Sequence, residues 1–544
     1  MAQRWPAAWP LIAFLGFAAL ALFVYREALH GPFVSDDFGY ISANPYTASL
    51  SAANVAAILD PRSDAKLHTA NYAPVHLLLH ALERQSFADR VLGYHLIGVL
   101  LHAANAALLA ALLAASGLPR AWALWGGLLF VVHPANVEAV AWISQRKTHV
   151  ALALTFAALL AWRRHEAGAT ALFALGLLAK ASAACALPMA AAFTWVRGGG
   201  RREWIWLGAW AGILILYAIP QLAAIGHIGG VEVAAFADPW VQLRTLAAVG
   251  TRYLVMAATG YGVSAYQEPA PALSWLDPWW LTALPAGAFL AWRALQALRE
   301  RREEAAWWIG AAAAFAPVSQ IFPFLNPVAD RYLYFILPGL LGGTLLALAG
   351  SRRMRALPRS SLALAAAALA VVFGVQAAAR ARLWQNETFL YLDAATHYPD
   401  GSTAHYLRAR RAAGEGDVAA AVAALRLASE RGIDTWSAIL GDPAFAGIRG
   451  EPAFVAVIRE IAGRWLEVAE QRRYASQPEL RAVAQARMFR EEYAEAEAAL
   501  EAALRADGLQ RDLVRAELER LRAHVARSIG AAGRAGDGDP AQRP

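Results

Sequence analysis

The sequence is poor in cysteine and in charged residues. Its single cysteine is Cys185, so one chain can form neither a disulfide framework nor a cysteine-based zinc site. Only 17% of the 544 residues are charged, whereas 58% are hydrophobic, and soluble proteins usually contain about 45–50% apolar residues. The composition therefore indicates a membrane protein. The net charge of +7 does not argue for nucleic-acid binding, because the basic residues lie mostly in short turns between apolar runs.

Apolar runs follow one another from residue 9 to about residue 378. A helix needs about 20 mainly apolar residues to cross a bilayer, and we expect about eleven spans. They lie near residues 9–26, 90–115, 120–133, 146–162, 168–180, 183–197, 203–224, 279–297, 305–322, 331–350 and 360–378. We expect the first to be an uncleaved span rather than a signal peptide, and the apolar segment 243–258 to be re-entrant or interfacial.

The predicted fold class is all-α with two parts. Residues 1–380 are expected to form a polytopic transmembrane domain with a long first loop at 27–89, and residues 381–528 a soluble helical domain. Residues 529–544 are expected to be disordered. The basic turns predict a multi-pass protein of the inner (cytoplasmic) membrane with a cytoplasmic N-terminus. An odd number of spans then places the first loop and the C-terminal domain together on the periplasmic or extracytoplasmic side.

Two adjacent acids, Asp36 and Asp37, open the first loop. Carboxylates near a membrane surface are costly to desolvate and are functional candidates. Neighbouring residues of a helix point in different directions, so the two acids should have separate roles. The alternative is an interfacial helix that one of these side chains caps.

Four basic residues lie at the ends of spans on the side where the charge bias predicts few cations. Arginine makes bidentate contacts to phosphate, and lysine supplies a point charge. Each cation alone could be a long side chain reaching the interface, but the set favours an anion-binding site. The four are Arg146, Lys147, Lys180 and Arg331. His76 and His80 are four residues apart and could share a helix face for a divalent metal, although such histidines are more often core groups. No cofactor is expected with certainty.

The C-terminal part contains a repeated spacing of small residues. Ala421, Leu425 and Ala428 match Ala496, Leu500 and Ala503 in their steps of four and three. This pattern lets two antiparallel helices approach closely, as in tetratricopeptide repeats. The alternative is an unspecialised helical hairpin. Two turns within residues 436–454 should interrupt any regular array.

Several motifs occur in one order along residues 10–430. The densest is HPANVEAVAWISQRK at residues 133–147. The others are the acidic pair at 36–37, NYAP at 71–74, GYHL at 93–96, LAK at 178–180, ADRYLY at 329–334 and LWQNET at 383–388. Together they resemble bacterial relatives of the transmembrane and tetratricopeptide-repeat O-mannosyltransferases, which are polytopic glycosyltransferases of the C-type fold. Within these motifs, further site candidates are Tyr72, His95, His133, Glu138, Asp330 and Tyr332.

The resemblance implies transfer of a sugar from a polyprenyl-phosphate carrier to an acceptor hydroxyl, expected to be that of a protein, on the extracytoplasmic face. Asp36, with Asp37 beside it, would act on the acceptor hydroxyl, and the four cations would hold the donor phosphate. The helical repeats would guide a peptide or protein acceptor. One departure matters: the family usually has an acid after the Arg-Lys pair, whereas Thr148 and His149 follow here, which bears on activity and on metal use.

Two other classes of function are open at this point. A non-enzymatic membrane scaffold would use the repeats to bind a protein partner, and the altered step at Thr148 supports it. A transporter or lipid-sugar flippase is the third class, but the spans show no convincing internal repeat of the kind common in transporters.

Overall fold

The computed structural model describes residues 8–69, 71–162, 164–226, 237–321, 327–472, 474, 476–506 and 508–536. These described residues form helices joined by turns and loops, with no β-strand among them, so the all-α prediction is confirmed. The chain divides into two compact units, Met1–Pro399 and Asp400–Pro544. The sequence places this division near residue 380, one helix earlier.

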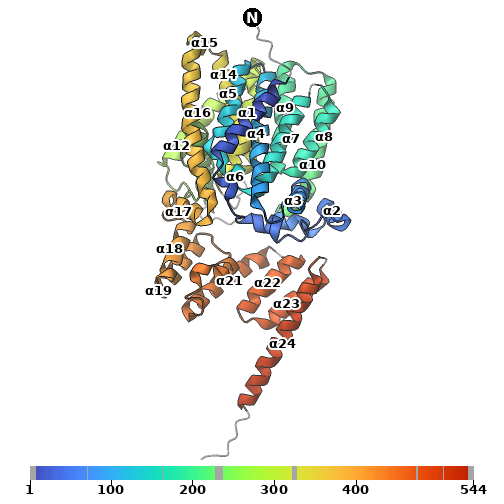
Figure 1. Ribbon diagram of the computed structural model, residues 1–544, viewed down its shortest axis with the longest axis vertical. Helices are drawn as coiled ribbons and strands as arrows, with labels where there is room; N and C mark the ends of the chain where they lie inside the picture. Colours follow the sequence, from blue (N-terminus) through green and yellow to red (C-terminus); the bar gives the residue numbers. More distant parts are fainter. Residues whose placement is uncertain are drawn as a thin grey trace, which may run out of the picture. The chain divides into compact units, whose positions relative to one another are not determined.

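The first unit is a bundle of long helices (Figure 1). Backbone polar groups within a bilayer must be paired internally, which favours helices in such apolar runs. The helices of the bundle are α1 (Trp9–Val24), α4 (Val91–Ala115), α5 (Arg120–Val132), α6 (Val137–Ala141), α7 (Arg146–Ala161), α8 (Glu166–Ala179), α9 (Ala186–Arg197), α10 (Arg201–Gly226), α11 (Pro239–Thr259), α12 (Pro278–Arg299), α13 (Glu304–Phe315), α14 (Asp330–Gly350) and α16 (Arg359–Ala381).

Length and composition identify four described helices that could each cross a bilayer, namely α4, α10, α14 and α16. A fifth is formed if α5 and the following segment, which bend by 55°, make one broken span. The helices α1 and α8 are apolar but shorter. The chain is thus a multi-pass membrane protein, and the count of eleven spans stays a prediction. The expected break between 168–180 and 183–197 is present, because Lys180 is extended between α8 and α9.

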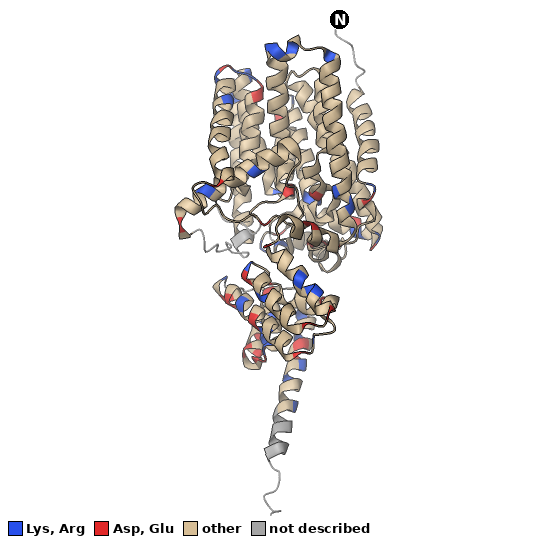
Figure 2. Cartoon of the chain, turned by 90° about the vertical axis from the view of Figure 1, so that its left-hand side faces the viewer, with Lys and Arg blue, Asp and Glu red and all other residues tan. Residues whose placement is uncertain are grey.

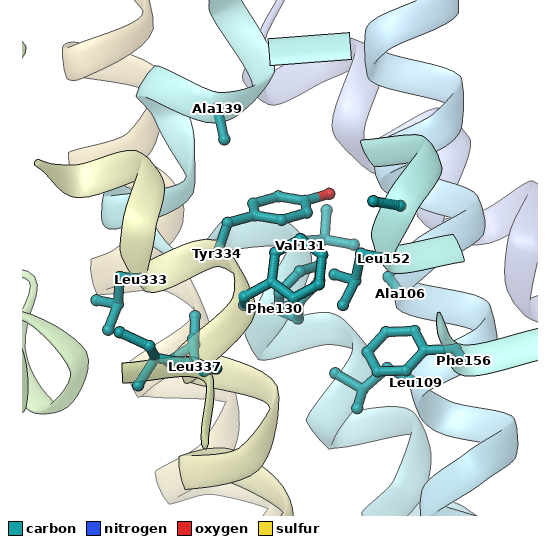
Figure 3. Packing of buried hydrophobic residues seen from close by; sticks show 14 of the residues in the cluster. Ala106, Leu109, Phe130, Val131, Ala139, Leu152, Phe156, Leu333, Tyr334 and Leu337 are labelled. Atoms are coloured by element: carbon teal, nitrogen blue, oxygen red, sulfur yellow. The ribbon is translucent and has the colours of Figure 1, made fainter. Parts of the chain in front are cut away.

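The bundle is centred on α4, which packs against α1, α5 and α7. Figure 3 shows Phe130 of α5, Leu152 of α7 and Tyr334 of α14 converging in this core. The rings of Phe130 and Tyr334 lie 5.0 Å apart. By contrast, α16 lies at the edge of the bundle (Figure 1), and only 11% of its apolar window is buried by protein. Such an uncovered apolar helix fits contact with lipid.

Charged residues gather near the two ends of the bundle and are rare between them (Figure 2). At one end, Arg197 forms a bidentate pair with Glu303 at 2.5 and 2.7 Å, and Arg301 lies over the Trp195 ring. The turns that follow α9 and α12 are therefore neighbours, as the positive-inside threading predicts. The segment 243–258 lies within α11, which packs against α12 and α14. Which end of the bundle faces outwards stays a prediction.

The first loop is compact and folds against the other end of the bundle. It contains α2 (Ala52–Leu59), α3 (Pro74–Phe87) and the short helical turns η1 (Ala28–His30), η2 (Phe38–Ser42) and η3 (Asp64–Thr69). Ser51 caps α2 by accepting a hydrogen bond from the backbone N–H of Asn54. The first loop thus presents a fixed surface next to the ends of α4 and α7.

Two more helices complete the first unit. They are α15 (Arg352–Ala356) and α17 (Glu387–His397).

The second unit consists of paired helices. They are α18 (Ser402–Gly414), α19 (Val418–Glu430), α20 (Trp436–Gly441), α21 (Pro452–Gln471), α22 (Gln477–Phe489), α23 (Tyr493–Arg505) and α24 (Arg511–Gly536). The small residues of both predicted triplets, in α19 and α23, are fully buried, and these helices pack against α18 and α22. The short α20 and the longer α21 lie between the two hairpins, and the irregular stretch from α20 to the start of α21 coincides with the interruption that the sequence predicts. The assignment as tetratricopeptide repeats stays a proposal.

The end of the chain differs from expectation over part of its length. Residues 529–544 are predicted to be disordered, but α24 continues to Gly536. Residues 537–544 lie outside the described part of the chain.

Candidate functional site

Asp37 connects the first loop to the turn before α7. Its carboxylate accepts hydrogen bonds from the backbone N–H of Val34 at 3.0 Å and of Ser144 at 2.7 Å. The Ser144 hydroxyl donates a third hydrogen bond to the same carboxylate. Burial raises the pKa of Asp37 to about 7, although these hydrogen bonds act in the opposite direction. The side chain is completely buried, so Asp37 holds two segments together and does not face a ligand.

Asp36 has the opposite environment, since its side chain is exposed. The preceding residue, Ser35, has a φ of 51°, in the left-handed region that costs a non-glycine residue energy. Of the two adjacent acids, Asp37 is buried and Asp36 is exposed. Asp36 interacts electrostatically with Tyr40, Lys147 and Arg331. The separate roles expected for the two acids correspond to these two environments.

Lys147 lies in the first turn of α7 and is largely buried. Its ammonium group donates a hydrogen bond to the Tyr40 hydroxyl at 3.3 Å and lies 4.7 Å from the centre of the Tyr40 ring. A tyrosine face stabilises a cation without neutralising it. The positive charge of Lys147 therefore stays available beside Asp36.

Arg331 comes from the first turn of α14 and pairs with Glu138 of α6. The Arg331 guanidinium donates to Glu138 Oε1, and the Arg331 backbone N–H donates to Glu138 Oε2 at 2.7 Å. The guanidinium also lies 5.3 Å from the Trp142 ring and 5.1 Å from the Tyr332 ring. Two ring faces and one carboxylate hold the group in a single orientation.

Lys180 stands at the break between α8 and α9. Its ammonium group donates a hydrogen bond to the Thr148 hydroxyl oxygen at 2.8 Å, and that hydroxyl donates to Gln145 Oε1 at 2.8 Å. Within the described part of the chain, no carboxylate forms a hydrogen bond or ion pair with Lys180. Its side chain is thus held in place by neutral groups.

Three cations, from α7, from α14 and from the break between α8 and α9, therefore converge at one end of the bundle. Lys180 interacts electrostatically with Lys147 and Arg331, and Lys147 with Arg331. Like charges repel, and Glu138, which pairs with Arg331, offsets one of them. The cation cluster of Lys147, Lys180 and Arg331 therefore favours an added anion, with exposed Asp36 beside it.

Arg146, the fourth predicted cation, is not part of the cation cluster. Its side chain is only 2% exposed. The guanidinium donates to Glu83 Oε1 at 2.7 Å and to the backbone carbonyl of Tyr94, and Glu83 Oε2 lies 2.8 Å from His80 Nδ1. Arg146 thus joins α7 to α3 and α4, and its hydrogen bonds go to Glu83 and Tyr94 rather than to the cation cluster.

Three further sequence candidates tie the scaffold together. The His95 ring lies 3.0 Å from the Gly31 carbonyl oxygen. Both His133 nitrogens have backbone partners, at Ala257 and Ala135. The Tyr72 hydroxyl donates to the Leu59 carbonyl at 2.7 Å. None of these contacts joins the cation cluster.

Asp330 borders the cluster without entering it. Its carboxylate accepts a hydrogen bond from the Gln267 amide at 2.7 Å, and it is buried. Gln267 belongs to the loop that follows α11. This hydrogen bond fixes that loop beside the first turn of α14.

The described residues do not fit a metal centre. Among them, no group of three His, Cys, Asp or Glu side chains is arranged to hold a metal ion. His76 and His80 do lie together, with ring centres 4.4 Å apart, but Arg146 and His80 already engage the nearby Glu83. The cations beside Asp36 would repel an added metal ion.

Sequence reasoning found Glu138, the partner of Arg331, among its candidates but missed the other partners of these cations. Trp142 lies in the motif at residues 133–147 and Tyr40 lies three residues after Asp37, but a ring face that holds a cation has no spacing signature. Glu83 could have been found, because an acid on an otherwise apolar helix face predicts a buried basic partner. The loop after α11 carries no motif at all.

No protein-family model matches the chain. A stretch of 160 residues, or 28% of the chain, is 35% identical to the protein O-mannosyl-transferase Tmtc1 of Drosophila melanogaster and covers 18% of that protein. A solved structure, the Archaeoglobus fulgidus oligosaccharyltransferase tethered with an acceptor peptide, aligns with a TM-score of 0.41 and 13% identity, over 69% of this chain and 55% of that one. The chain thus spans less than a fifth of the curated relative and about half of the solved one. The match to Tmtc1 confirms the resemblance to O-mannosyltransferases that the sequence motifs indicate.

Proposed function

We propose that this protein is a membrane glycosyltransferase that moves a sugar from a polyprenyl-phosphate carrier to an acceptor hydroxyl on the extracytoplasmic face. The observation that carries the proposal is the exposed carboxylate of Asp36 beside the cation cluster of Lys147, Lys180 and Arg331. A phosphate ester and an attacking hydroxyl need these two kinds of group at adjacent positions.

The cation cluster would bind the donor phosphate. Arg331 has a fixed guanidinium that can present N–H groups to phosphate oxygens, and Lys147 and Lys180 supply point charges. Negative charge on the phosphate grows as its bond to the sugar breaks. Cations already held in place by Tyr40, Thr148 and the Trp142 ring stabilise that charge without reorganising.

Asp36 would act on the acceptor hydroxyl. In this step the acceptor oxygen forms a bond to the anomeric carbon, and the bond from that carbon to the phosphate oxygen breaks. The hydroxyl proton passes to the Asp36 carboxylate, and the polyprenyl phosphate leaves with the electron pair. A general base of this kind contributes about 10²–10⁴-fold to a rate.

Asp37 and Arg146 would be positioning residues. The three hydrogen bonds to Asp37 fix the segment that presents Asp36. The ion pair between Arg146 and Glu83 fixes the first turn of α7, which presents Lys147. Both pairings join the first loop to the bundle. Loss of the first pairing would therefore displace Asp36, and loss of the second would displace Lys147.

The second unit would bind the peptide or protein acceptor. It carries a cleft of about 480 Å³ whose lining holds arginines and glutamates together. Such a mixed lining can hydrogen-bond to a peptide of varied sequence. The lining residues are Arg426, Glu430, Glu460, Gly463, Arg464, Leu466, Glu467, Glu470, Arg487, Arg490 and Glu492.

A turnover assay tests the proposal. Purified protein in lipid nanodiscs, given a polyprenyl-phosphate hexose and an acceptor peptide, should release polyprenyl phosphate and glycosylate the peptide. Asp36→Asn should lower the rate at least about 100-fold, the usual contribution of a general base, and leave donor binding in place. Asp89→Asn is the matched control, because Asp89 is another exposed acid of the same loop. Equal activity of Asp36→Asn and wild type would contradict the role of Asp36, and the absence of both donor binding and turnover in wild type would favour the scaffold alternative.

A further inference from the structure

A second polar group lies near Asp36 and Glu138, which border the cation cluster, and has no role in the reaction described above. Tyr266 belongs to the loop after α11, and Tyr391 and Glu387 belong to the first turns of α17. The rings of Tyr266 and Tyr391 lie 5.4 Å apart with their planes 34° from parallel. The Tyr391 hydroxyl donates a hydrogen bond to Glu387 Oε1 at 2.8 Å. All three side chains are partly exposed, so a ligand can reach them.

Two hydrogen bonds on either side of Tyr266 hold this group in place. The Gln267 amide donates to Asp330, the residue before Arg331, at 2.7 Å. The Ser264 hydroxyl donates to Asp393 of α17 at 2.8 Å. Asp393 in turn forms a bidentate pair with Arg380 of α16. A loop with no regular structure is thereby fixed to both α14 and α17.

The charges around Tyr266 are negative, whereas those of the cation cluster are positive. Tyr266 interacts electrostatically with Glu387, Glu138 and Asp36. Carboxylates accept hydrogen bonds, and tyrosine hydroxyls both donate and accept them. A pair of tyrosine faces offers apolar area to a flat ligand and needs little ordering, because each side chain has few rotatable bonds.

A sugar ring combines the features that such a group recognises. Its C–H face packs against aromatic rings, and its hydroxyls donate to carboxylates. A second phosphate would be repelled by the three acids. A sugar ring bonded to a phosphate in the cation cluster would have its anomeric carbon near Asp36. The rest of the sugar ring would then be available to the group of Tyr266, Tyr391 and Glu387.

We propose that Tyr266, Tyr391 and Glu387 form the subsite for the transferred sugar ring of the donor. The inference rests on the proposed function and names the part of the same site that distinguishes a sugar-bearing carrier from a bare one. The tyrosines hold the ring by its face, and Glu387 accepts a hydrogen bond from a ring hydroxyl. This group sets which hexose is accepted.

Binding of two carriers tests the subsite. Protein in nanodiscs is titrated with a short-chain polyprenyl phosphate and with the same carrier bearing mannose, glucose or galactose. We expect Tyr266→Ala to weaken binding of the preferred sugar-bearing carrier about tenfold, or about 1.4 kcal/mol, and to change binding of the bare carrier less than twofold. Glu387→Gln, which keeps the shape of the side chain, should weaken the same carrier and alter the ranking of the hexoses. Tyr261→Ala is the matched control, because Tyr261 lies in the same loop and is 70% exposed.

The outcomes separate the subsite from the proposed function. Lys180→Ala should weaken both carriers, since both contain the phosphate. If wild-type protein binds both carriers equally, or if Tyr266→Ala and Glu387→Gln weaken neither or weaken both alike, the subsite is overturned while the phosphate site stands. If wild-type protein binds neither carrier, the proposed function itself fails.

Discussion

The Lys180 ammonium group donates a hydrogen bond to the Thr148 hydroxyl oxygen at 2.8 Å, at the step of the sequence where the resembling glycosyltransferases usually carry an acid. A hydroxyl holds the Lys180 side chain in place without supplying a negative charge. Together with Lys147 and Arg331, Lys180 therefore attracts phosphate more strongly than it would beside an acid. The departure from the family pattern thus lies beside the proposed donor site.

Thr148→Glu should weaken donor binding. The introduced carboxylate would pair with Lys180 and reduce the attraction for phosphate, and we expect the donor KM to rise about tenfold, or about 1.4 kcal/mol. Thr148→Ser keeps the hydroxyl and is the control, with a KM within about twofold of wild type. Steady-state kinetics with a polyprenyl-phosphate hexose measure both. A lower KM in Thr148→Glu would show that Lys180 does not hold the phosphate.

Arg331→Gln should cost both stability and activity, for different reasons. It leaves Glu138 buried without its partner, and losing one member of a buried pair costs about 3–5 kcal/mol. The double variant Arg331→Gln/Glu138→Gln should regain most of the thermal stability but no activity, because the phosphate ligand is still absent. Thermal unfolding in detergent and the turnover assay measure the two effects. Recovered activity in the double variant would remove Arg331 from the donor site.

Arg146→Gln provides the contrasting case. It should destabilise the protein by a similar amount, because Glu83 then stays buried without its cation and keeps only the His80 ring as a partner. Here the double variant Arg146→Gln/Glu83→Gln should regain stability and most of the activity, since Arg146 supports the site without contacting the donor. Donor KM close to wild type in the double variant is the expected readout. A KM that stays tenfold higher would restore Arg146 as a phosphate ligand.

Asp37 should make stability depend on pH. Its pKa is raised to about 7 in the folded protein, so the folded state binds its proton more tightly than the unfolded state, where the ordinary pKa is about 4. The stabilisation is present below pH 4 and is lost as the pH rises to about 7, by at most about 4 kcal/mol. Melting temperatures measured from pH 4 to pH 8 should fall by more in wild type than in Asp37→Asn. Parallel curves for the two proteins would contradict this assignment.

The sequence predicts the helices better than it predicts the partners of the cations. Long apolar runs and the break at Lys180 can be read directly, because helical backbone pairing is local. The pairing of Arg146 with Glu83 joins residues far apart in the chain, and a single sequence does not reveal which acid meets which base. Tyr266 could not be found either, since its position depends on two hydrogen bonds from an irregular loop. The second unit shows the same difference between what the sequence predicts and what it does not. The spacing of the buried small residues in α19 can be read from the sequence, whereas the residues that line the cleft cannot.

The close packing of α13 against α14 affects the position of a site residue, because α14 also carries Arg331. A side chain at Gly342 would meet the Trp307 ring at 2.2 Å, and one at Gly343 would meet the Trp308 ring at 2.5 Å. These glycines set how deeply α14 sits, while Arg331 lies about 16 Å away along the same axis. A single methyl group added at either glycine would push α14 away from α13, and the same movement would shift the Arg331 guanidinium at the start of α14.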